Sequence, residues 1–440
     1  MSTHNLDTPD REELVASTSR PMPRAFTVVS AIFAIIGALV FIVGVFSGES
    51  RVWQALHFNW LFFASVSQAG VVFVAVQRIT TARWSRPVVR LLEGYVAFLP
   101  VAFLLLVLIF LGGKHVFPWA VHEVPIPEKR LYLNYGFVAA RDLVMFAILT
   151  ALSVWYVYTS VRLDVGLVPE SGAAWARGIR ARMRRGFGEE RREIHSTHSL
   201  QGKLSIWLCI LFNFFFIILS WDLSMSLDLF FQSTMYGWWF YMGAWVAALA
   251  SWSILTMWWR AHLGAEDIIT EDHFHDLGKL TFAFTAFWGY LTFAQYLVIW
   301  YGNMPEETHW FRLRLIEPWT AGTIAVVILA FVIPFFGLLS RAAKVYLPTF
   351  FAFALSSVVG IWILRYVEVY PSLHYKEVNA PFGLWEIGIA LGFLGLWGLC
   401  YRAFMDAFPR VRVALITSPY RDEVQVPVNP DTMEPLPAHE

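Results

Sequence analysis

The residues from Thr270 to Thr308, TEDHFHDLGKLTFAFTAFWGYLTFAQYLVIWYGNMPEET, decide the fold class. An acidic, histidine-bearing entry leads into a run from Leu280 to Tyr301 that contains no ionised side chain. Because a helix needs about 20 residues to cross a bilayer, this run predicts a transmembrane helix. The entry places four polar side chains within two helical turns: His273, His275, Asp276 and Lys279.

The composition of the whole chain shows that this run is one of many. Of the 440 residues, 57% are hydrophobic and 15% are charged, and the mean hydropathy is +0.54. A soluble domain is about 25% charged, so we expect an all-α polytopic membrane protein. The ten predicted spans are Ala25–Phe46, Phe58–Gln77, Leu91–Leu111, Asn134–Tyr158, Leu204–Leu223, Met235–Met257, Lys279–Tyr301, Trp319–Leu339, Leu347–Val369 and Leu384–Ala407.

Lysine and arginine predict the orientation of these spans. The two terminal segments and the loops on their side of the membrane hold 24 of them, and the opposite side holds 7. Cytoplasmic loops carry the excess of positive charge. We therefore expect both termini to be cytoplasmic; the family resemblance given below implies the cytoplasmic membrane of a bacterium.

Outside the membrane domain, 25–407, we expect a cytoplasmic N-terminal segment, 1–24, without the pattern of a cleaved signal. The tail, 408–440, is rich in proline and is predicted to be extended along a partner. The longest loop, 164–203, contains ARGIRARMRRGFGEERRE. Its charge either retains the loop in the cytoplasm or contacts anionic lipid or a partner.

A loose internal repeat organises the spans. The second span opens with HFNWLFFASVSQAG and the sixth with STMYGWWFYMGAWVAA, and in each aromatic residues precede small ones. The fifth and ninth spans end with a carboxylate at the same side, Asp222 and Glu368. The repeat predicts two four-helix bundles, spans 2–5 (about 58–223) and spans 6–9 (about 235–369), with spans 1 and 10 peripheral. Chance similarity between aromatic-rich helices is the alternative.

Redox centres are not expected in this chain. Membrane b-haems need pairs of histidines deep within spans, and none of the twelve histidines lies near a span centre. The two cysteines, Cys209 and Cys400, form no CxxC or ferredoxin-type pattern. We expect no haem, iron–sulphur cluster or structural zinc, and no nucleic-acid partner; lipids are candidate ligands, and the family resemblance given below implies a quinone as another.

Ionisable groups within or at the ends of spans are costly in a bilayer and often functional. Arg141 and Asp142 lie two turns inside the fourth span, and Arg365 and Glu368 are three residues apart, within pairing distance on a helix. For both pairs, ion pairing that locks the helices and a functional role remain open. Asp142 and Glu93 favour a proton role, because carboxylates usually handle protons inside membrane proteins. Two further candidates bracket the outer end of the fifth span: Asp222 and Asp228.

Polar side chains also form stripes along two spans. An arc of about 100° on the seventh span contains Thr281, Thr285, Trp288, Thr292, Gln295, Tyr296 and Asn303. These groups would hold a file of water, although helix–helix packing is the commoner role of such residues. On the fourth span, one face carries Asp142, Ser153, Tyr156 and Ser160. About 16 Å separate Asp142 from Ser153, so water or another helix would have to bridge them.

The entry to the seventh span reads as a helix cap, with Thr270 or Asp272 at the N-cap position. A metal site at His273 and His275 is disfavoured, because residues two apart diverge by about 200° on a helix. His275, Asp276 and Lys279 stay candidates for the start of a proton path. Two of them, His275 and Lys279, lie on a different helix face from the polar stripe.

Three stretches resemble one family. ITEDHFHDLGKLTFAFTAFWGYLTFAQYLVIWYGNMPEET, WDLSMSLDLFFQSTMYGWWFYMG (Trp221–Gly243) and TARWSRPVVR (Thr81–Arg90) are similar to the ActF subunits of alternative complex III, a bacterial quinol:cytochrome c oxidoreductase. The resemblance implies ten helices in two four-helix bundles plus two peripheral helices, related to the NrfD/PsrC family. It also implies a subunit without a redox centre that helps to conduct protons. The implied partners are an ActC-like quinol-binding membrane subunit, an iron–sulphur subunit and multihaem and monohaem cytochrome c subunits.

Four functions follow from these observations. The first is a non-redox membrane subunit that couples quinol oxidation to proton movement. The second is direct quinol binding at the outer ends of spans 4, 5 and 9, with Asp142, Asp222 or Asp228 as the base. The third, a secondary transporter, is weaker because Pro100, Pro334 and Pro348 do not fall at corresponding places in two repeats. The fourth is a structural scaffold.

Overall fold

The computed structural model describes residues 10–424. Within that range helices are the only regular elements, and ten are long and apolar enough to cross a membrane. The protein is thus an all-α polytopic membrane protein, as predicted. The spanning elements are α2 (Arg24–Phe46), α3 (Arg51–Ile79), α4–η1–α5 (Val89–Leu111), α7 (Tyr135–Leu167), α9 (Glu190–Leu223), α10 (Tyr236–Leu263), α11 (Glu271–Gly302), α13–η6–α14 (Thr320–Gly337), α16 (Leu347–Leu373) and α17 (Leu384–Ala407).

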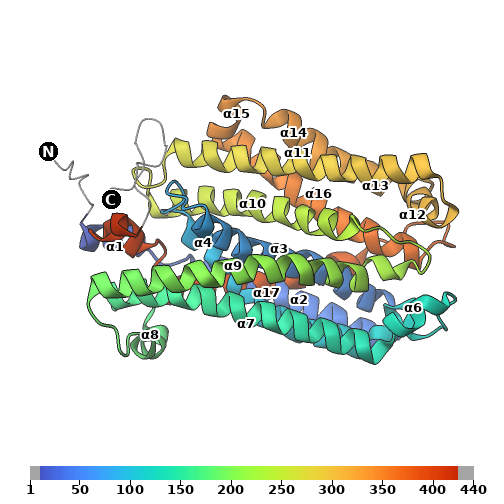
Figure 1. The fold of residues 1–440 in the computed structure, drawn as a ribbon, viewed down its shortest axis with the longest axis horizontal. Helices are drawn as coiled ribbons and strands as arrows, with labels where there is room; N and C mark the ends of the chain where they lie inside the picture. Colours follow the sequence, from blue (N-terminus) through green and yellow to red (C-terminus); the bar gives the residue numbers. More distant parts are fainter. Residues whose placement is uncertain (1–9, 425–440) are drawn as a thin grey trace, which may run out of the picture.

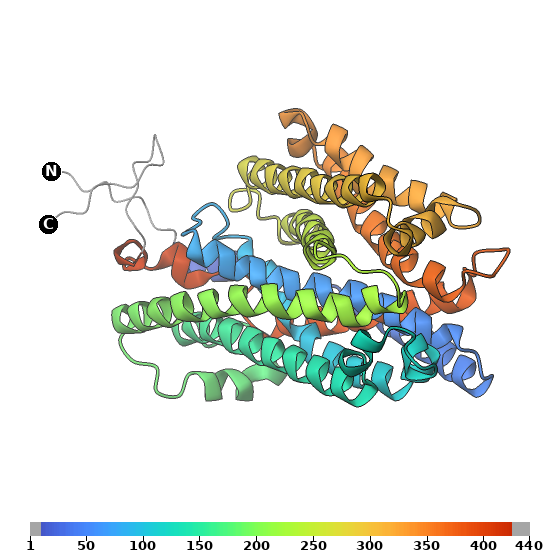
Figure 2. The same ribbon diagram turned by 45° about the vertical axis from the view of Figure 1, so that its right-hand side comes forward.

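The spanning helices form two groups (Figures 1 and 2). Helices α3, α5, α7 and α9 contact one another, as do α10, α11, the α13–α14 span and α16. These groups are spans 2–5 and 6–9, which we call the first and second bundles. Helix α10 packs against α3 and α9, and α16 packs against α3, so the bundles share a broad interface. Helices α2 and α17 pair with each other beside α3.

The two inner helices, α3 and α10, are rich in small residues. In their apolar windows 94% and 83% of residues are buried, against 17% in the peripheral α2. Lipid tails are as apolar as the core, so close backbone packing, rather than hydrophobicity, holds such helices together. Glycine allows the closest approach: a Cβ added to Gly37 of α2 would lie 2.2 Å from the Cα of Gly392 in α17.

Two spans are interrupted near proline, which lacks the N–H of a helical hydrogen bond. The third span runs as α4 (Val89–Glu93), a 3₁₀ turn η1 (Gly94–Phe98) and α5 (Leu99–Leu111), with Pro100 in the first turn of α5. The eighth runs as α13 (Thr320–Val326), a π-helical segment η6 (Val327–Val332) and α14 (Ile333–Gly337), which contains Pro334. These breaks fall at different places in the two bundles.

Both described termini lie at one end of the molecule (Figure 1). We call it the basic end because Arg78 lines a cavity with Arg412 of the C-terminal segment, and Arg90 shares the acids that Arg412 contacts. The opposite end, the far end, carries α6 (Pro127–Tyr132) and α12 (Pro305–Leu315). The remaining elements are short: α1 (Arg11–Thr18), η2 (Gly113–His115), η3 (Pro118–Ala120), η4 (Ala174–Ala176), α8 (Arg177–Met183), η5 (Met225–Leu227), α15 (Arg341–Val345), α18 (Val413–Thr417) and η7 (Arg421–Glu423).

Two sequence predictions about the basic end are corrected. The segment 164–203 is mostly helical, because α7 continues to Leu167, α8 follows, and α9 begins at Glu190. The tail is not extended throughout: Val411 and Val413 are buried against α1, and α18 forms a helical turn. Alternating valine and arginine let this segment bury apolar groups while its arginines reach acids. Residues 425–440 of the predicted tail lie outside the described residues.

Candidate functional site

A pair of carboxyl groups lies at the far end of the first bundle. Asp142 of α7 and Asp222 of α9 are fully buried and within hydrogen-bonding reach of each other. Arg141 donates from Nε to Asp222 Oδ2 at 2.9 Å, and its Nη2 lies 2.7 Å from the same oxygen. Arg141 thus forms an ion pair between helices, one of the two alternatives that the sequence left open, and its partner is Asp222 rather than the adjacent Asp142. Adjacent helical residues point in different directions, and Arg141 reaches α9 instead.

The charges of this cluster do not balance if both acids are ionised. Among the described residues, neither oxygen of Asp142 has a hydrogen-bond donor, and Asp222 Oδ1 has none. The guanidinium of Arg141 lies over the ring of Tyr132, 4.1 Å from its centroid, and compensates one carboxylate only. Two carboxyl groups hydrogen-bond each other only when one carries a proton. A buried pair that shares one proton satisfies both the charge and the hydrogen bond.

Apolar side chains separate this pair from Ser153 along the buried face of α7. Phe146 and Leu149 of α7 are fully buried between Asp142 and Ser153, and Phe146 packs edge-on against Trp60. Beyond these side chains, Gln68 of α3 donates to Ser153 at 2.8 Å. The four residues predicted to share a face of the fourth span are all buried, as expected: Asp142, Ser153, Tyr156 and Ser160.

Glu93 lies in a buried charge network at the basic end. Arg90 donates to Glu93 Oε2 at 2.5 Å, and Ser160 donates to both carboxylate oxygens at 2.8 and 3.0 Å. Arg90 also donates to Asp164 of α7, and Arg412 donates to Glu93 Oε1 at 3.0 Å. The negative charges of Glu93 and Asp164 therefore balance the positive charges of Arg90 and Arg412. In contrast to Asp142, Glu93 is thus enclosed by its ion pairs, which favours the structural interpretation.

Arg412 fastens the C-terminal segment to this network. Its side chain is 5% exposed, and the backbone N–H of Ala414 donates to Asp164 Oδ1 at 2.8 Å. Burial lowers the pKa of the Arg412 guanidinium, but Glu93 and Asp164 raise it by more, so its pKa lies above the ordinary value. The cation therefore persists at any pH at which the protein is folded, and it joins residues 319 positions apart in the chain.

The second bundle contains the predicted Arg365–Glu368 pair, which is confirmed. Arg365 Nη1 donates to both Glu368 oxygens at 2.7 and 2.8 Å, and its Nη2 donates to the carbonyl of Phe240. Arg314 of α12 donates to the carbonyls of Val367 and Glu368. Burial lowers the pKa of Arg314 to about 10. These contacts fix the end of α16 and favour a structural role.

Asp228 stabilises a local turn and does not act together with Asp222 at the end of the helix. Its Oδ1 accepts backbone N–H groups of Phe230 and Phe231 at 3.2 and 3.3 Å. This is the usual use of an aspartate in a loop, where the side chain replaces a backbone acceptor. Asp222 and Asp228, which the sequence predicts to flank the outer end of the fifth span, thus have different roles.

The stripe on the seventh span lies partly on the buried face of α11. Thr281, Thr285, Trp288 and Gln295 are buried, whereas Tyr296 is 38% exposed. Two hydroxyls bond carbonyls of their own helix: Thr281 to Leu277 and Thr292 to Trp288, and Thr292 also accepts from Trp239 Nε1 at 2.8 Å. Such contacts belong to helix packing. Among the described residues no hydrogen bonds link the members of the stripe into a continuous chain, and its role as a proton path stays a prediction.

The entry to α11 is a cap, as predicted. Thr270 is the N-cap, and its N–H donates to Nδ1 of His273, which completes a capping box. Lys279 pairs with Asp276 at 2.7 Å, and the Lys279 side chain is 55% exposed. Among the described residues, no hydrogen bond joins Asp276 or Lys279 to the buried stripe. Within residues 10–424 no cluster of three potential metal ligands occurs, at the entry or elsewhere.

A cleft of about 530 Å³ opens at the far end between α9, the loop 232–235, α11 and α12. Its lining includes Trp221, Gln295 and Glu307, but not Asp142, Asp222 or Arg365. Trp221 Nε1 and Gln295 Oε1 are buried, and neither has a hydrogen-bond partner within the described part of the chain. One unused donor and one unused acceptor beside apolar walls are typical of a small-molecule site.

Sequence reasoning named Asp142 and Asp222 but missed the network at the basic end. Arg90 and Arg412 entered the lysine and arginine count only as charges of a loop and of the tail, and Asp164 only marked the start of the longest loop. The spacing of Arg90 and Glu93, three apart on a helix, was the available local signal. No family model matches the chain, and a search of curated proteins found no match.

Proposed function

We propose that this protein is a non-redox membrane subunit of a quinol-oxidising complex, of the ActF kind, and that it holds a transferable proton between Asp142 and Asp222. The resemblance of three sequence stretches supports the class. The arrangement of ten helices as two bundles with a peripheral pair agrees with it. The observation that carries the proton role is the buried Asp142 carboxyl group without a donor, beside a second carboxyl and one arginine.

The chemistry of the pair suits proton storage rather than free conduction. A proton shared by two carboxyl groups leaves when a change nearby stabilises the second negative charge. Movement of Arg141 to a position between the two acids would do this, since its positive charge would then stabilise the second negative charge as well as the first. The apolar section at Phe146 and Leu149 separates the pair from Ser153. Passage beyond it therefore requires entry of water or a shift of these side chains.

Infrared difference spectroscopy tests the shared proton directly. A protonated carboxyl group has a carbonyl-stretch band that an amide variant removes. Asp142→Asn should remove one such band, whereas Asp228→Asn, which alters an acid of a turn at the same end, should leave it in place. A band that survives Asp142→Asn and Asp222→Asn alike would contradict the shared proton.

Purification in mild detergent tests the class. The proposal expects an iron–sulphur subunit, multihaem and monohaem cytochrome c subunits and an ActC-like membrane subunit to copurify with the chain. Purification with only unrelated transport or assembly proteins would contradict membership of a quinol-oxidising complex. The shared proton would remain testable by the infrared experiment.

A second candidate, quinol binding by this chain itself, is favoured by the far-end cleft. Gln295 and Trp221 line the cleft, but their unpaired Oε1 and Nε1 atoms are buried behind its surface. A turn of these side chains toward the cleft would let Gln295 Oε1 accept from a quinol hydroxyl and Trp221 Nε1 donate to a quinone carbonyl. This location differs from the one expected from the sequence, which placed the ring beside Asp222 and Arg365. Arg365 and Glu368 are buried in their own ion pair and lie outside the lining of the cleft.

A further inference from the structure

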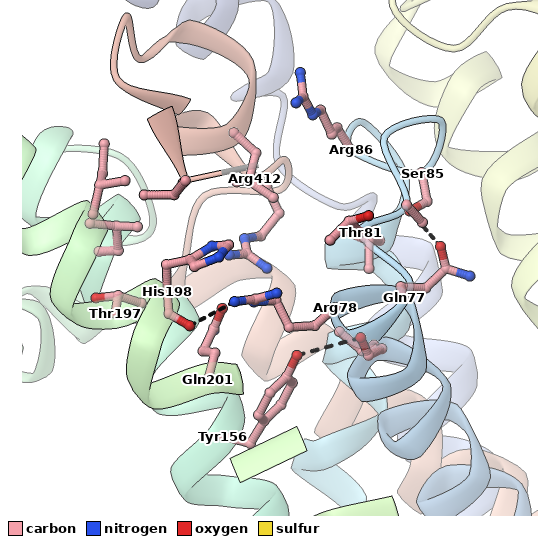
Figure 3. Close-up of a pocket in the computed structure, with 17 residues that line it drawn as sticks. Gln77, Arg78, Thr81, Ser85, Arg86, Tyr156, Thr197, His198, Gln201 and Arg412 are labelled. Carbon is pink, nitrogen blue, oxygen red and sulfur yellow. Dashed lines mark hydrogen bonds between the residues drawn. The ribbon is translucent and has the colours of Figure 1, made fainter. Parts of the chain in front are cut away.

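A separate cavity of about 60 Å³ lies at the basic end, between α3, α9 and the C-terminal segment. Its volume suits a few water molecules or one tetrahedral oxyanion. Figure 3 shows the side chains of Arg78, His198 and Arg412 converging on this space, with Arg86 further out. No aspartate or glutamate is among the described lining residues.

The charges around this cavity leave a positive excess. The charge of Arg412 is balanced behind the cavity wall by Glu93 and Asp164, together with Arg90. Arg78 has no such partner: its Nη2 donates to the carbonyl of His198 at 2.8 Å, and its buried Nε has no acceptor within the described chain. A carbonyl satisfies one N–H but does not neutralise a guanidinium.

The cations also repel one another. Arg78 and Arg412 are close enough to repel each other electrostatically. Holding like charges together in a partly buried space is unfavourable unless an anion lies among them. Hydroxyl and amide groups of Thr81, Thr197 and Gln201 line the same space and supply further hydrogen bonds.

We propose that this cavity binds a phosphate group, held by Arg78 with Arg412 and His198. Guanidinium groups present forked donors that match phosphate oxygens. The apolar part of the lining, which includes Val74, Val89 and Leu415, suits the glycerol side of a phospholipid headgroup. Basic pockets between transmembrane helices bind anionic headgroups. A phosphodiester and free phosphate share the same recognition chemistry, and the experiment separates them.

The test uses the purified complex in detergent, with bound lipid removed. One arm titrates inorganic phosphate, and the other titrates phosphatidylglycerol against phosphatidylcholine, with retained mass measured by native mass spectrometry. Arg78→Gln should weaken binding by about tenfold or more, and Arg78→Lys by less. Arg177→Gln, which removes an exposed charge of α8 at the same end, should change nothing.

The possible outcomes distinguish the two ligands and test whether the cavity binds phosphate at all. If phosphatidylglycerol binds in preference to phosphatidylcholine, the ligand is a lipid headgroup. If inorganic phosphate binds as tightly as phosphatidylglycerol does, the cavity is a small-anion site. Absence of both in the unaltered protein, or equal loss in Arg78→Gln and Arg177→Gln, would overturn the proposal. If Arg78→Gln does not fold, Gln201→Glu takes its place: the new carboxylate should abolish binding and raise the melting temperature. Unchanged binding with a lower melting temperature would contradict the site.

Discussion

Asp142 and Asp222 lie within hydrogen-bonding reach on neighbouring helices, and Arg141 bonds only Asp222. This asymmetry distinguishes the far end of the first bundle from the basic end. There, Glu93 and Asp164 share Arg90 and Arg412, and each of these four charges has a partner. A balanced network fixes structure, whereas an unbalanced carboxyl pair can exchange a proton with small changes around it.

Loss of the Glu93 charge is expected to destabilise the fold. Glu93→Gln leaves Arg90 and Arg412 with Asp164 alone, and one uncompensated buried cation costs about 3–5 kcal/mol. Thermal unfolding in detergent should show a clear decrease in melting temperature. Asp276→Asn, which breaks a partly exposed pair with Lys279, should cost less than about 1 kcal/mol. Equal, small effects of both changes would show that the network at Glu93 is not structural.

The sequence predicted the spans and the buried face of α7 well, because hydrophobic length and helical phase are local properties. Arg365 and Glu368 were also predictable, since they pair within one helical turn. The partner of Arg141 was not, because Asp222 is 81 residues away, and phase shows which way a side chain points but not which helix it meets. For the same reason, the contact of Arg412 with Glu93 could not be predicted from the sequence.

The pairing of α2 with α17 is expected to depend on the contact between Gly37 and Gly392. A Cβ added at Gly392 would lie 2.7 Å from the Cα of Gly37. Gly392→Ala should therefore push the helices apart at a cost of about 1–3 kcal/mol, measured by thermal unfolding. Gly178→Ala, which meets nothing within 4 Å, should be neutral or slightly stabilising. Tolerance of alanine at both positions would contradict the close contact.

If the far-end cleft binds quinol, the amide of Gln295 should matter. Gln295→Leu should weaken binding of a short-chain quinone analogue by about three- to tenfold, the effect of one hydrogen bond, as followed by quenching of tryptophan fluorescence. Thr285→Val is the matched control, because the Thr285 hydroxyl is also buried on α11 without a partner but lies outside the cleft lining. Equal binding by the two variants would count against the quinol site.

Proton translocation by the complete complex in vesicles tests the central claim most directly. Asp142→Asn should lower the number of protons translocated per electron, while quinol oxidation stays within about twofold of the unaltered rate, because the amide cannot exchange a proton. Asp228→Asn should leave both quantities unchanged. An unaltered proton-to-electron ratio in Asp142→Asn, in a complex that still oxidises quinol, would contradict a proton role for the Asp142–Asp222 pair.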